Sequence, residues 1–326
     1  MPRGPLMIIG GAEDKLRKRR ILREFVAAAG GTEARIAVIP TASSLGNEIV
    51  DVYDALFRVE GAAEVTTVRP ESREEANDPD LVGVLEKATG IFMTGGNQLK
   101  LSAIVSGTPI GEAIVAAHQR GAVVGGTSAG ASIQSSHMPA FGVGGSTPKQ
   151  RMTQMAAGLG LLPSTVIDQH FAQRNRYGRL LMIVAQSPQL IGMGIDEDTA
   201  AVVRDDVLSV VGRGAVTILD PSRITTNAFD AKRSAPLLAS GVVLHVLPQG
   251  ARFDLRTREL LPFETHVDPL EAAEIEEAGR DLRQMARDIA ASDASPSVLR
   301  RRLRRTRKAD PHPARPDDDP YLDGDD

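Results

Sequence analysis

The sequence of 326 residues contains no cysteine and no tryptophan, and aromatic residues make up only 3% of it. The absence of cysteine excludes disulfide bonds, a cysteine nucleophile and thiolate metal sites. The shortage of aromatic residues predicts an aliphatic core, as in sheets that are covered by helices. Hydrophobic residues make up 42% of the chain, which suffices for one large domain or two smaller ones.

A strong excess of one charge and long apolar runs are also missing. The net charge is −4, which implies no general attraction to nucleic acid or to an anionic membrane. No apolar run is long enough to span a bilayer, and Met1–Gly4 lacks the apolar segment of a signal peptide. We therefore expect a cytoplasmic enzyme without a membrane partner.

Short apolar runs alternate with helical patterns along the first half of the chain. The expected strands are Pro5–Ile9, Arg35–Ile39, Glu64–Val68, Gly90–Met93 and Ala122–Val124. The expected helices are Ala12–Ala29, Gly46–Val59, Asp80–Ala88 and Pro109–Arg120. This alternation predicts an α/β fold, with a mostly parallel sheet and helices on both faces. Ligands bind such sheets at the carboxyl ends of the strands, where the chain has Gly10-Gly11, Gly95-Gly96 and Gly125-Gly126.

The pattern changes at about Ala200. Short β-rich runs predict a C-terminal antiparallel β section, over Ala201–Val203, Val207–Val211, Ala215–Leu219 and Gly241–Leu247. We assign 1–268 to a catalytic domain and 269–326 to a charged helical or disordered tail, with a charged helix over Pro269–Ala291.

Two opposite charge runs lie within this tail. Arg300–Lys308 carries seven positive charges in nine residues, and Asp317–Asp326 carries six aspartates. Such runs are typically solvated tail, and we do not expect nucleic acid as a partner. The alternative is a basic segment that docks nucleic acid or an acidic polymer.

The segment Gly125–Gly130 follows an apolar strand and precedes a helical start. A Gly-x-Ser-x-Gly sequence on a strand-to-helix turn is typical of a nucleophile elbow, with Ser128 as the nucleophile. An ordinary glycine-rich turn is the alternative. An oxyanion hole needs two N–H donors, and we predict those of Ala129 and Gly96.

A serine nucleophile needs a base and a group that orients the base. His170 follows the apolar run Thr165–Ile167, so it is placed at the carboxyl end of a strand, level with Ser128; a structural histidine is the alternative. His118 is expected to face solvent, and His137 to end the helix after the elbow. The orienting acid is one of Asp196, Glu197 and Asp198, which follow the strand Ile191–Ile195.

Three arginines, Arg174, Arg176 and Arg179, follow His170 closely. Arginine is the side chain best suited to bidentate recognition of carboxylates, so the cluster predicts an acidic substrate. An exposed arginine-rich helix face is the alternative.

Four motifs occur together and in order: Gly10–Lys15, Thr94–Gln98, Gly126–Ala131 and Asp168–Phe171. With them the chain, over roughly residues 5 to 265, resembles the cyanophycinase family of serine exopeptidases. This family is related to aspartyl dipeptidase (peptidase E) and, in fold, to the flavodoxin-like class I glutamine amidotransferases. The resemblance implies a homodimer without cofactor or metal. It also implies hydrolysis, through an acyl-enzyme, of cyanophycin, a poly-aspartate with an arginine on each side-chain carboxylate, to β-Asp-Arg dipeptides.

The resemblance also implies residue roles. Ser128 would be the nucleophile, His170 the base and Glu197 the third member. The implied pocket residues are Gln98, Asp168, Gln169, Arg174, Arg176 and Arg179. The arginines would bind backbone carboxylates, whereas Asp168 and the glutamines would bind guanidinium groups. An aspartyl or isoaspartyl peptidase of the same fold and a non-catalytic binding protein are the alternatives. The segment Phe141–Gln154 is a candidate cleft loop to which the resemblance assigns no role.

Overall fold

The computed structural model describes residues 2–232 and 235–262, together with Arg280 and Arg283. The chain divides into one compact unit, Met1–His266, and a second unit that begins at Val267. The fold described here is that of the first unit. Apart from Arg280 and Arg283, the helix predicted over 269–291 and both charge runs lie outside the described residues.

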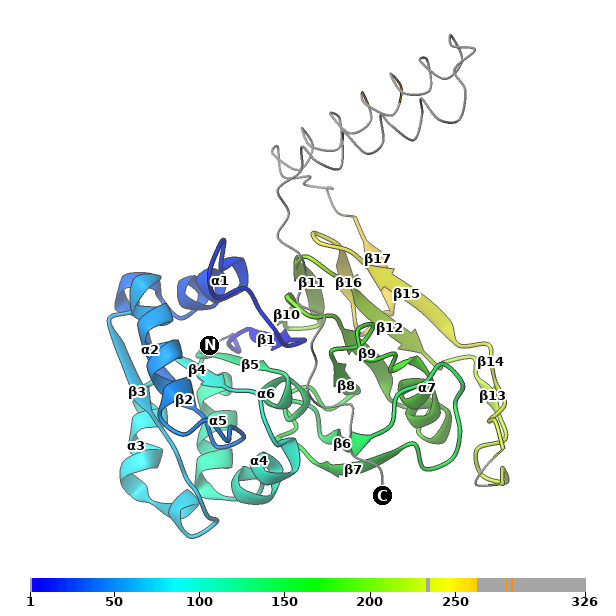
Figure 1. Ribbon diagram of the computed structural model, residues 1–326, viewed down its shortest axis with the longest axis horizontal. Helices are drawn as coiled ribbons and strands as arrows, with labels where there is room; N and C mark the ends of the chain where they lie inside the picture. The colour runs from blue at the N-terminus through cyan, green and yellow to red at the C-terminus, as the bar shows by residue number, and fades with distance from the viewer. Residues whose placement is uncertain (1, 233–234, 263–279, 281–282, 284–326) are drawn as a thin grey trace, which may run out of the picture. The chain divides into compact units, whose positions relative to one another are not determined.

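Strands and helices alternate in the first half of the unit, and strands dominate the second half (Figure 1). The helices are α1 (Arg20–Ala28), α2 (Glu48–Val59), α3 (Pro79–Lys87), α4 (Gln98–Val105), α5 (Pro109–Gln119), α6 (Ala129–Ser132) and α7 (Tyr177–Gln186), with short 3-10 turns η1 (Gly31–Glu33) and η2 (Glu75–Asn77). The first strands are β1 (Leu6–Ile9), β2 (Arg35–Ile39), β3 (Glu64–Thr67), β4 (Gly90–Met93), β5 (Val123–Thr127), β6 (His137–Gly142), β7 (Thr153–Ala157), β8 (Thr165–Gln169) and β9 (Ile191–Ile195). The later strands are β10 (Thr199–Arg204), β11 (Val207–Gly212), β12 (Val216–Asp220), β13 (Thr225–Thr226), β14 (Ala239–Ser240), β15 (Val243–Leu247), β16 (Arg252–Asp254) and β17 (Glu259–Leu261).

The largest sheet has nine strands in the order β17-β16-β11-β10-β1-β5-β4-β2-β3. Strands β1, β5, β4, β2 and β3 are mutually parallel, as the sequence predicts. Within them, Ile9 of β1 lies opposite Thr127 of β5. The four strands from β10 to β17 extend the same sheet in antiparallel fashion. The sheet is therefore mixed rather than mostly parallel.

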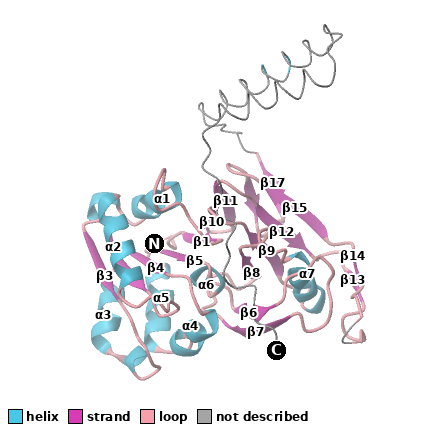
Figure 2. Cartoon of the chain, in the orientation of Figure 1, coloured by secondary structure: helices cyan, strands magenta, loops and turns pink. Residues whose placement is uncertain are grey.

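Helices cover both faces of this sheet (Figure 2). The side chains of β1 alternate between the faces, as those of any strand do. Met7 and Ile9 pack in one apolar cluster with residues of α1 and α2, whereas Leu6 and Ile8 pack in another with residues of α3, α4 and α5. The predicted layering is therefore present, and its core is mainly aliphatic.

A second sheet has four strands in the order β15-β12-β9-β8. Strands β8 and β9 are parallel and are connected through α7, while β12 and β15 join them in antiparallel fashion. Val166, Leu180 and Leu219 bring α7 onto one face of this sheet. The sequence predicts a mostly parallel sheet with a C-terminal antiparallel section, but not that β8 and β9 belong to a second sheet. Local alternation specifies that a segment is a strand but not which strand it pairs with.

The helix predicted over Ala12–Ala29 begins only at Arg20. The carboxylate of Asp14 accepts hydrogen bonds from the backbone N–H groups of four following residues, Leu16, Arg17, Lys18 and Arg19. An aspartate that binds nearby N–H groups in this way offers the backbone an alternative to the helix.

Two histidines lie elsewhere than predicted. His118, expected to face solvent, is only 7% exposed and lies among the buried residues of α5. His137 begins β6 rather than ending a helix, because the helix after the elbow stops at Ser132. The candidate cleft loop starts and ends in a hairpin, in which Phe141 of β6 pairs with Gln154 of β7.

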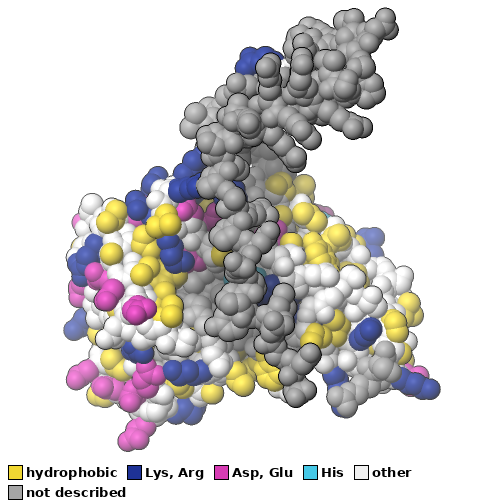
Figure 3. Space-filling model, viewed as in Figure 1, with side chains coloured by type: hydrophobic (Ala, Val, Ile, Leu, Met, Phe, Trp, Pro, Cys, Tyr) yellow, Lys and Arg dark blue, Asp and Glu magenta, His cyan; other side chains and the backbone are white. Residues whose placement is uncertain are grey.

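Among the described residues, no single helix is long and apolar enough to cross a membrane. Helices α4 and α5 would reach that length only together, and the chain bends by 92° between them. On the face shown in Figure 3, acidic and basic side chains intermix over the part of the unit that contains α2 and α3.

Candidate active site

Ser128 occupies a sharp turn between β5, which ends at Thr127, and α6, which begins at Ala129. Its backbone angles are φ 52° and ψ −106°, a strained conformation for a residue with a side chain. The flanking glycines permit this turn. A Cβ on Gly126 would lie 2.1 Å from the carbonyl oxygen of Gly130, and one on Gly130 would lie 2.2 Å from that of Met93. The local geometry is that of a nucleophile elbow.

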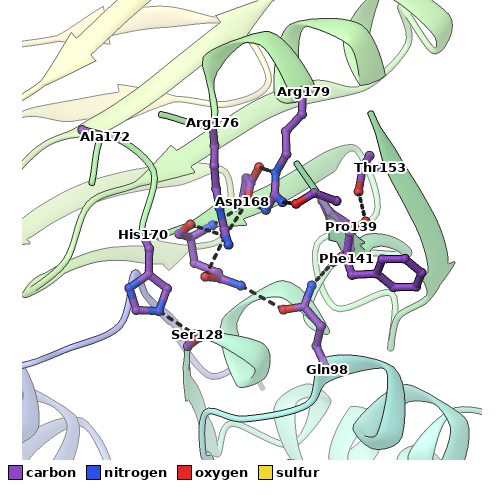
Figure 4. Close-up of polar contacts among 12 residues, drawn as sticks. Gln98, Ser128, Pro139, Phe141, Thr153, Asp168, His170, Ala172, Arg176 and Arg179 are labelled. Atoms are coloured by element: carbon purple, nitrogen blue, oxygen red, sulfur yellow. Dashed lines mark hydrogen bonds and ion pairs between the residues drawn. The ribbon is translucent and has the colours of Figure 1, made fainter. Parts of the chain in front are cut away.

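His170 lies directly after β8 and faces Ser128, although the two residues follow strands of different sheets (Figure 4). Its Nε2 is 3.1 Å from Ser128 Oγ, and its Nδ1 is 2.6 Å from Glu197 Oε1. Hydroxyl, imidazole and carboxylate thus follow one another at hydrogen-bond distance, the order that a serine triad requires.

The structure distinguishes the three neighbouring acids. Asp196 accepts hydrogen bonds from the backbone of Ala172 and Ala215, so its carboxylate holds two loops together. Asp198 accepts one from the N–H of Asp14. Of the three, Glu197 is the acid bonded to His170, and its side chain is 36% exposed.

Burial lowers the pKa of His170 below its ordinary value, and the positive charge of Arg174 lowers it further. The hydrogen bond that His170 Nδ1 donates to the Glu197 carboxylate opposes this effect by favouring the protonated ring. Since the lowering prevails, the imidazole is neutral at neutral pH. It is therefore ready to accept the proton of Ser128.

The end of β1 positions both partners. The carbonyl oxygen of Ile9 accepts the N–H of Ser128 at 3.0 Å, and that of Gly10 accepts the N–H of His170 at 2.8 Å. Gly11 has φ 104° and lies against the imidazole, where an added Cβ would be 2.3 Å from Cε1. The first glycine-rich turn thus connects the carboxyl ends of the two sheets.

Of the predicted oxyanion donors, Ala129 follows Ser128 directly and Gly96 lies in the turn after β4. Ala129 is the first residue of α6, so its N–H has no acceptor within that helix. Gly96 has φ 138°, and its Cα lies so close to the Ala42 carbonyl that only glycine fits. The adjacent Gly95 is next to the nucleophile, since a Cβ there would be 3.2 Å from Ser128 Cβ.

A chain of polar contacts runs beside the nucleophile (Figure 4). Gln98 donates to the carbonyl oxygen of Pro139 on β6 and accepts a 2.9 Å hydrogen bond from Gln169 Nε2. Gln169 Oε1 in turn accepts one of 2.9 Å from Arg176. The structure therefore brings these three predicted pocket residues together.

Asp168 is fully buried and binds two arginines. Arg179 donates to it through Nε at 2.6 Å and through a terminal nitrogen at 2.5 Å, and Arg176 donates at 3.1 Å. Arg179 is only 2% exposed and also donates to the Gly142 carbonyl. Burial lowers the pKa of Arg176 to about 10, which keeps it charged at neutral pH. The trio carries a net positive charge and suits an anionic ligand.

The three predicted arginines differ in what they present to solvent. Arg174 is exposed, whereas Arg176 and Arg179 are buried against Asp168. The alternative interpretation, an exposed arginine-rich helix face, is therefore wrong for Arg176 and Arg179. Sequence reasoning assigned no role to Gln173, whose Oε1 accepts the N–H of Glu197 at 3.1 Å. The available signal for a role of Gln173 was its position in the sequence, directly before Arg174.

An α/β fold with a serine on a strained elbow beside a neutral imidazole defines a serine hydrolase. The family model described as peptidase family S51 matches residues 6–211. The chain belongs to this family and is a serine-type peptidase.

Similar proteins agree with this assignment. A protein named cyanophycinase from Nostoc sp. (strain PCC 7120) is 43% identical over 261 residues, covering 79% of this chain and 87% of the relative. Another of that name from Synechococcus elongatus is 40% identical over 270 residues, covering 79% and 81%. A solved structure of a peptidase from an acI-B1 actinobacterium is 25% identical, with a TM-score of 0.57, and covers 78% of this chain and 97% of that one.

Proposed function

We propose that this protein is an exopeptidase that hydrolyses cyanophycin and releases β-Asp-Arg dipeptides. The observation that carries the proposal is the position of Ser128, His170 and Glu197 beside the net positive cluster of Asp168, Arg176 and Arg179. The names of the relatives support the substrate.

In the reaction, His170 Nε2 accepts the proton of Ser128 as Oγ attacks the carbonyl that joins one β-Asp-Arg unit to the next. The N–H groups of Ala129 and Gly96 stabilise the oxyanion. The amide bond breaks, His170 gives its proton to the leaving amine, and the acyl group remains on Ser128. A water molecule, deprotonated by His170, then hydrolyses the ester and restores the serine.

Substrate recognition divides between two kinds of group. Arg174 is exposed near the imidazole and can bind a substrate carboxylate directly. Arg176 and Arg179 are buried, and their positive charge favours an anionic substrate. The amides of Gln98 and Gln169 offer polar atoms for a guanidinium, while Asp168 acts mainly by holding the arginines.

The test is dipeptide release from purified cyanophycin, followed by mass spectrometry, for the wild type and for Ser128→Ala. Release by the wild type alone is expected. No release from either chain, with folding confirmed by circular dichroism, would overturn the cyanophycin assignment. Aspartyl and isoaspartyl dipeptides are then the substrates to assay with the same serine.

We also propose that the fold is of the class I glutamine amidotransferase-like type, which the nucleophile at the end of a central parallel strand supports. A homodimer and a cytoplasmic location stay predictions. Sedimentation of the purified chain tests the first, and fractionation of the source cells tests the second. Nucleic acid is not expected as a partner.

A further inference from the structure

Glu13 is a buried acid that the reaction as described does not use. It is 3% exposed, and each of its carboxylate oxygens has a partner. Oε2 accepts a hydrogen bond of 2.6 Å from the Thr127 hydroxyl. Oε1 accepts one of 2.5 Å from the Tyr53 hydroxyl and a charged one of 2.8 Å from Lys15.

The polarity of these bonds is fixed by the neighbours of Glu13. Burial and the nearby carboxylate raise the pKa of Tyr53, so its phenol remains a donor. Lys15 neutralises the charge, and its ammonium also lies over the Tyr53 ring at 5.4 Å. A buried carboxylate with three donors is a satisfied, rigid anchor.

Thr127 connects this anchor to the nucleophile. It is the last residue of β5, is 4% exposed and directly precedes Ser128. Ser128 has a φ of 52°, and a strained conformation persists only where the surroundings determine it. A hydrogen bond at the preceding side chain restricts rotation of the Thr127–Ser128 segment and hence the direction of Ser128 Oγ.

The loop that carries Glu13 also contacts His170 and Asp198, the residue after Glu197. Gly10 accepts the N–H of His170, and Asp14 donates its N–H to Asp198, which adjoins Glu197. The same loop also contacts the strand end that precedes the nucleophile, because the Glu13 side chain binds Thr127.

We propose that Glu13 is a positioning residue for Ser128. Through the Thr127 hydroxyl, its carboxylate holds the elbow in the conformation that places Ser128 Oγ within reach of His170. The proposal rests on the triad geometry and does not depend on which peptide is cleaved.

The test uses a fluorophosphonate probe, which reports on Ser128 without a natural substrate. Ser128 Oγ forms a bond to phosphorus, fluoride leaves, and the serine proton passes to His170. We expect the labelling rate to fall about 10- to 100-fold in Glu13→Gln and in Thr127→Val, because a small misplacement of the nucleophile has effects of this size. Thr127→Ser keeps the hydroxyl and is expected to label at nearly the wild-type rate.

Two controls separate positioning from general damage. Tyr53→Phe removes a hydrogen bond from the other oxygen of Glu13. It should lower the melting temperature but change the labelling rate little. The double variant Glu13→Gln/Thr127→Val should label no more slowly than Thr127→Val alone, since both changes act on the same hydrogen bond.

Several results would overturn the proposal. One is a wild-type labelling rate in Glu13→Gln. Another is a double variant whose labelling rate falls by the product of the two single-variant factors. A third is a wild-type chain in which the probe does not label Ser128 at all. If Ser128 is labelled but cyanophycin is not cleaved, the proposed substrate fails while the role of Glu13 is still decided.

Discussion

His170 links the pH dependence of the enzyme to its burial. Burial lowers the pKa of the imidazole, and only the neutral ring can accept the Ser128 proton. Activity should therefore be full at neutral pH and fall as the pH drops through a midpoint below about 6.5, the ordinary value for histidine. The measurement is the rate of fluorophosphonate labelling against pH. A midpoint above the ordinary value would contradict the assignment.

Arg174 gives this prediction a control. Its positive charge lowers the pKa of His170 from an exposed position. In Arg174→Gln the midpoint should move upward, towards the ordinary value. The shift should shrink in concentrated salt, because charges near the surface are screened.

Asp168 pairs with two buried arginines and neutralises part of their charge. In Asp168→Asn, Arg176 and Arg179 lose this counter-charge, so the free energy of unfolding should fall by about 3–5 kcal/mol. Urea denaturation measures the change. The matched control is Asp54→Asn, which breaks an exposed pair with Arg58 on α2 and should change the free energy of unfolding far less, because solvent screens such a pair. Equal losses in the two variants would contradict a special role for the buried trio.

The turn after β1 leaves little room for an added side chain. Gly11→Ala combines a φ of 104° with a Cβ at 2.3 Å from the imidazole, so His170 must move. We expect kcat/KM to fall about 100-fold. Gly83→Ala is the control, because α3 has open space there and alanine favours a helix by up to about 1 kcal/mol. A Gly11→Ala enzyme with wild-type activity would show that the turn does not position the base.

The elements were predictable where a local pattern determines them. The strand before Ser128 and the helix after Pro109 follow from an apolar run and from a proline at a helix start. The prediction that a helix begins at Ala12 was wrong. The four N–H groups that bind Asp14 belong to a loop, and apolar periodicity does not reveal such a loop. His118 likewise looked like a surface residue on a short helix whose burial depends on its neighbours.

The site depends on how two sheets meet, and this part of the fold could not be predicted. The sequence placed Ser128 and His170 at strand ends, and they lie 3.1 Å apart. The strands, however, belong to separate sheets, which are linked where the Gly10 carbonyl, after β1, accepts the N–H of His170, after β8. The choice among three acids was also open, since it depends on which side chain binds the loops after β8 and β11, as Asp196 does through Ala172 and Ala215. Long-range pairing of this kind leaves no local signal.

All described residues of the triad and its pocket lie within the unit Met1–His266. A chain that ends at His266 should therefore fold, label with fluorophosphonate at the wild-type rate and release dipeptides from cyanophycin. The comparison with the full chain also tests the basic run over 300–308, because nucleic acid binding through it would weaken with salt and disappear on truncation. A truncated chain that labels normally but cleaves the polymer poorly would assign polymer binding to the removed segment. One that fails to label would show that the first unit needs the second for its active site.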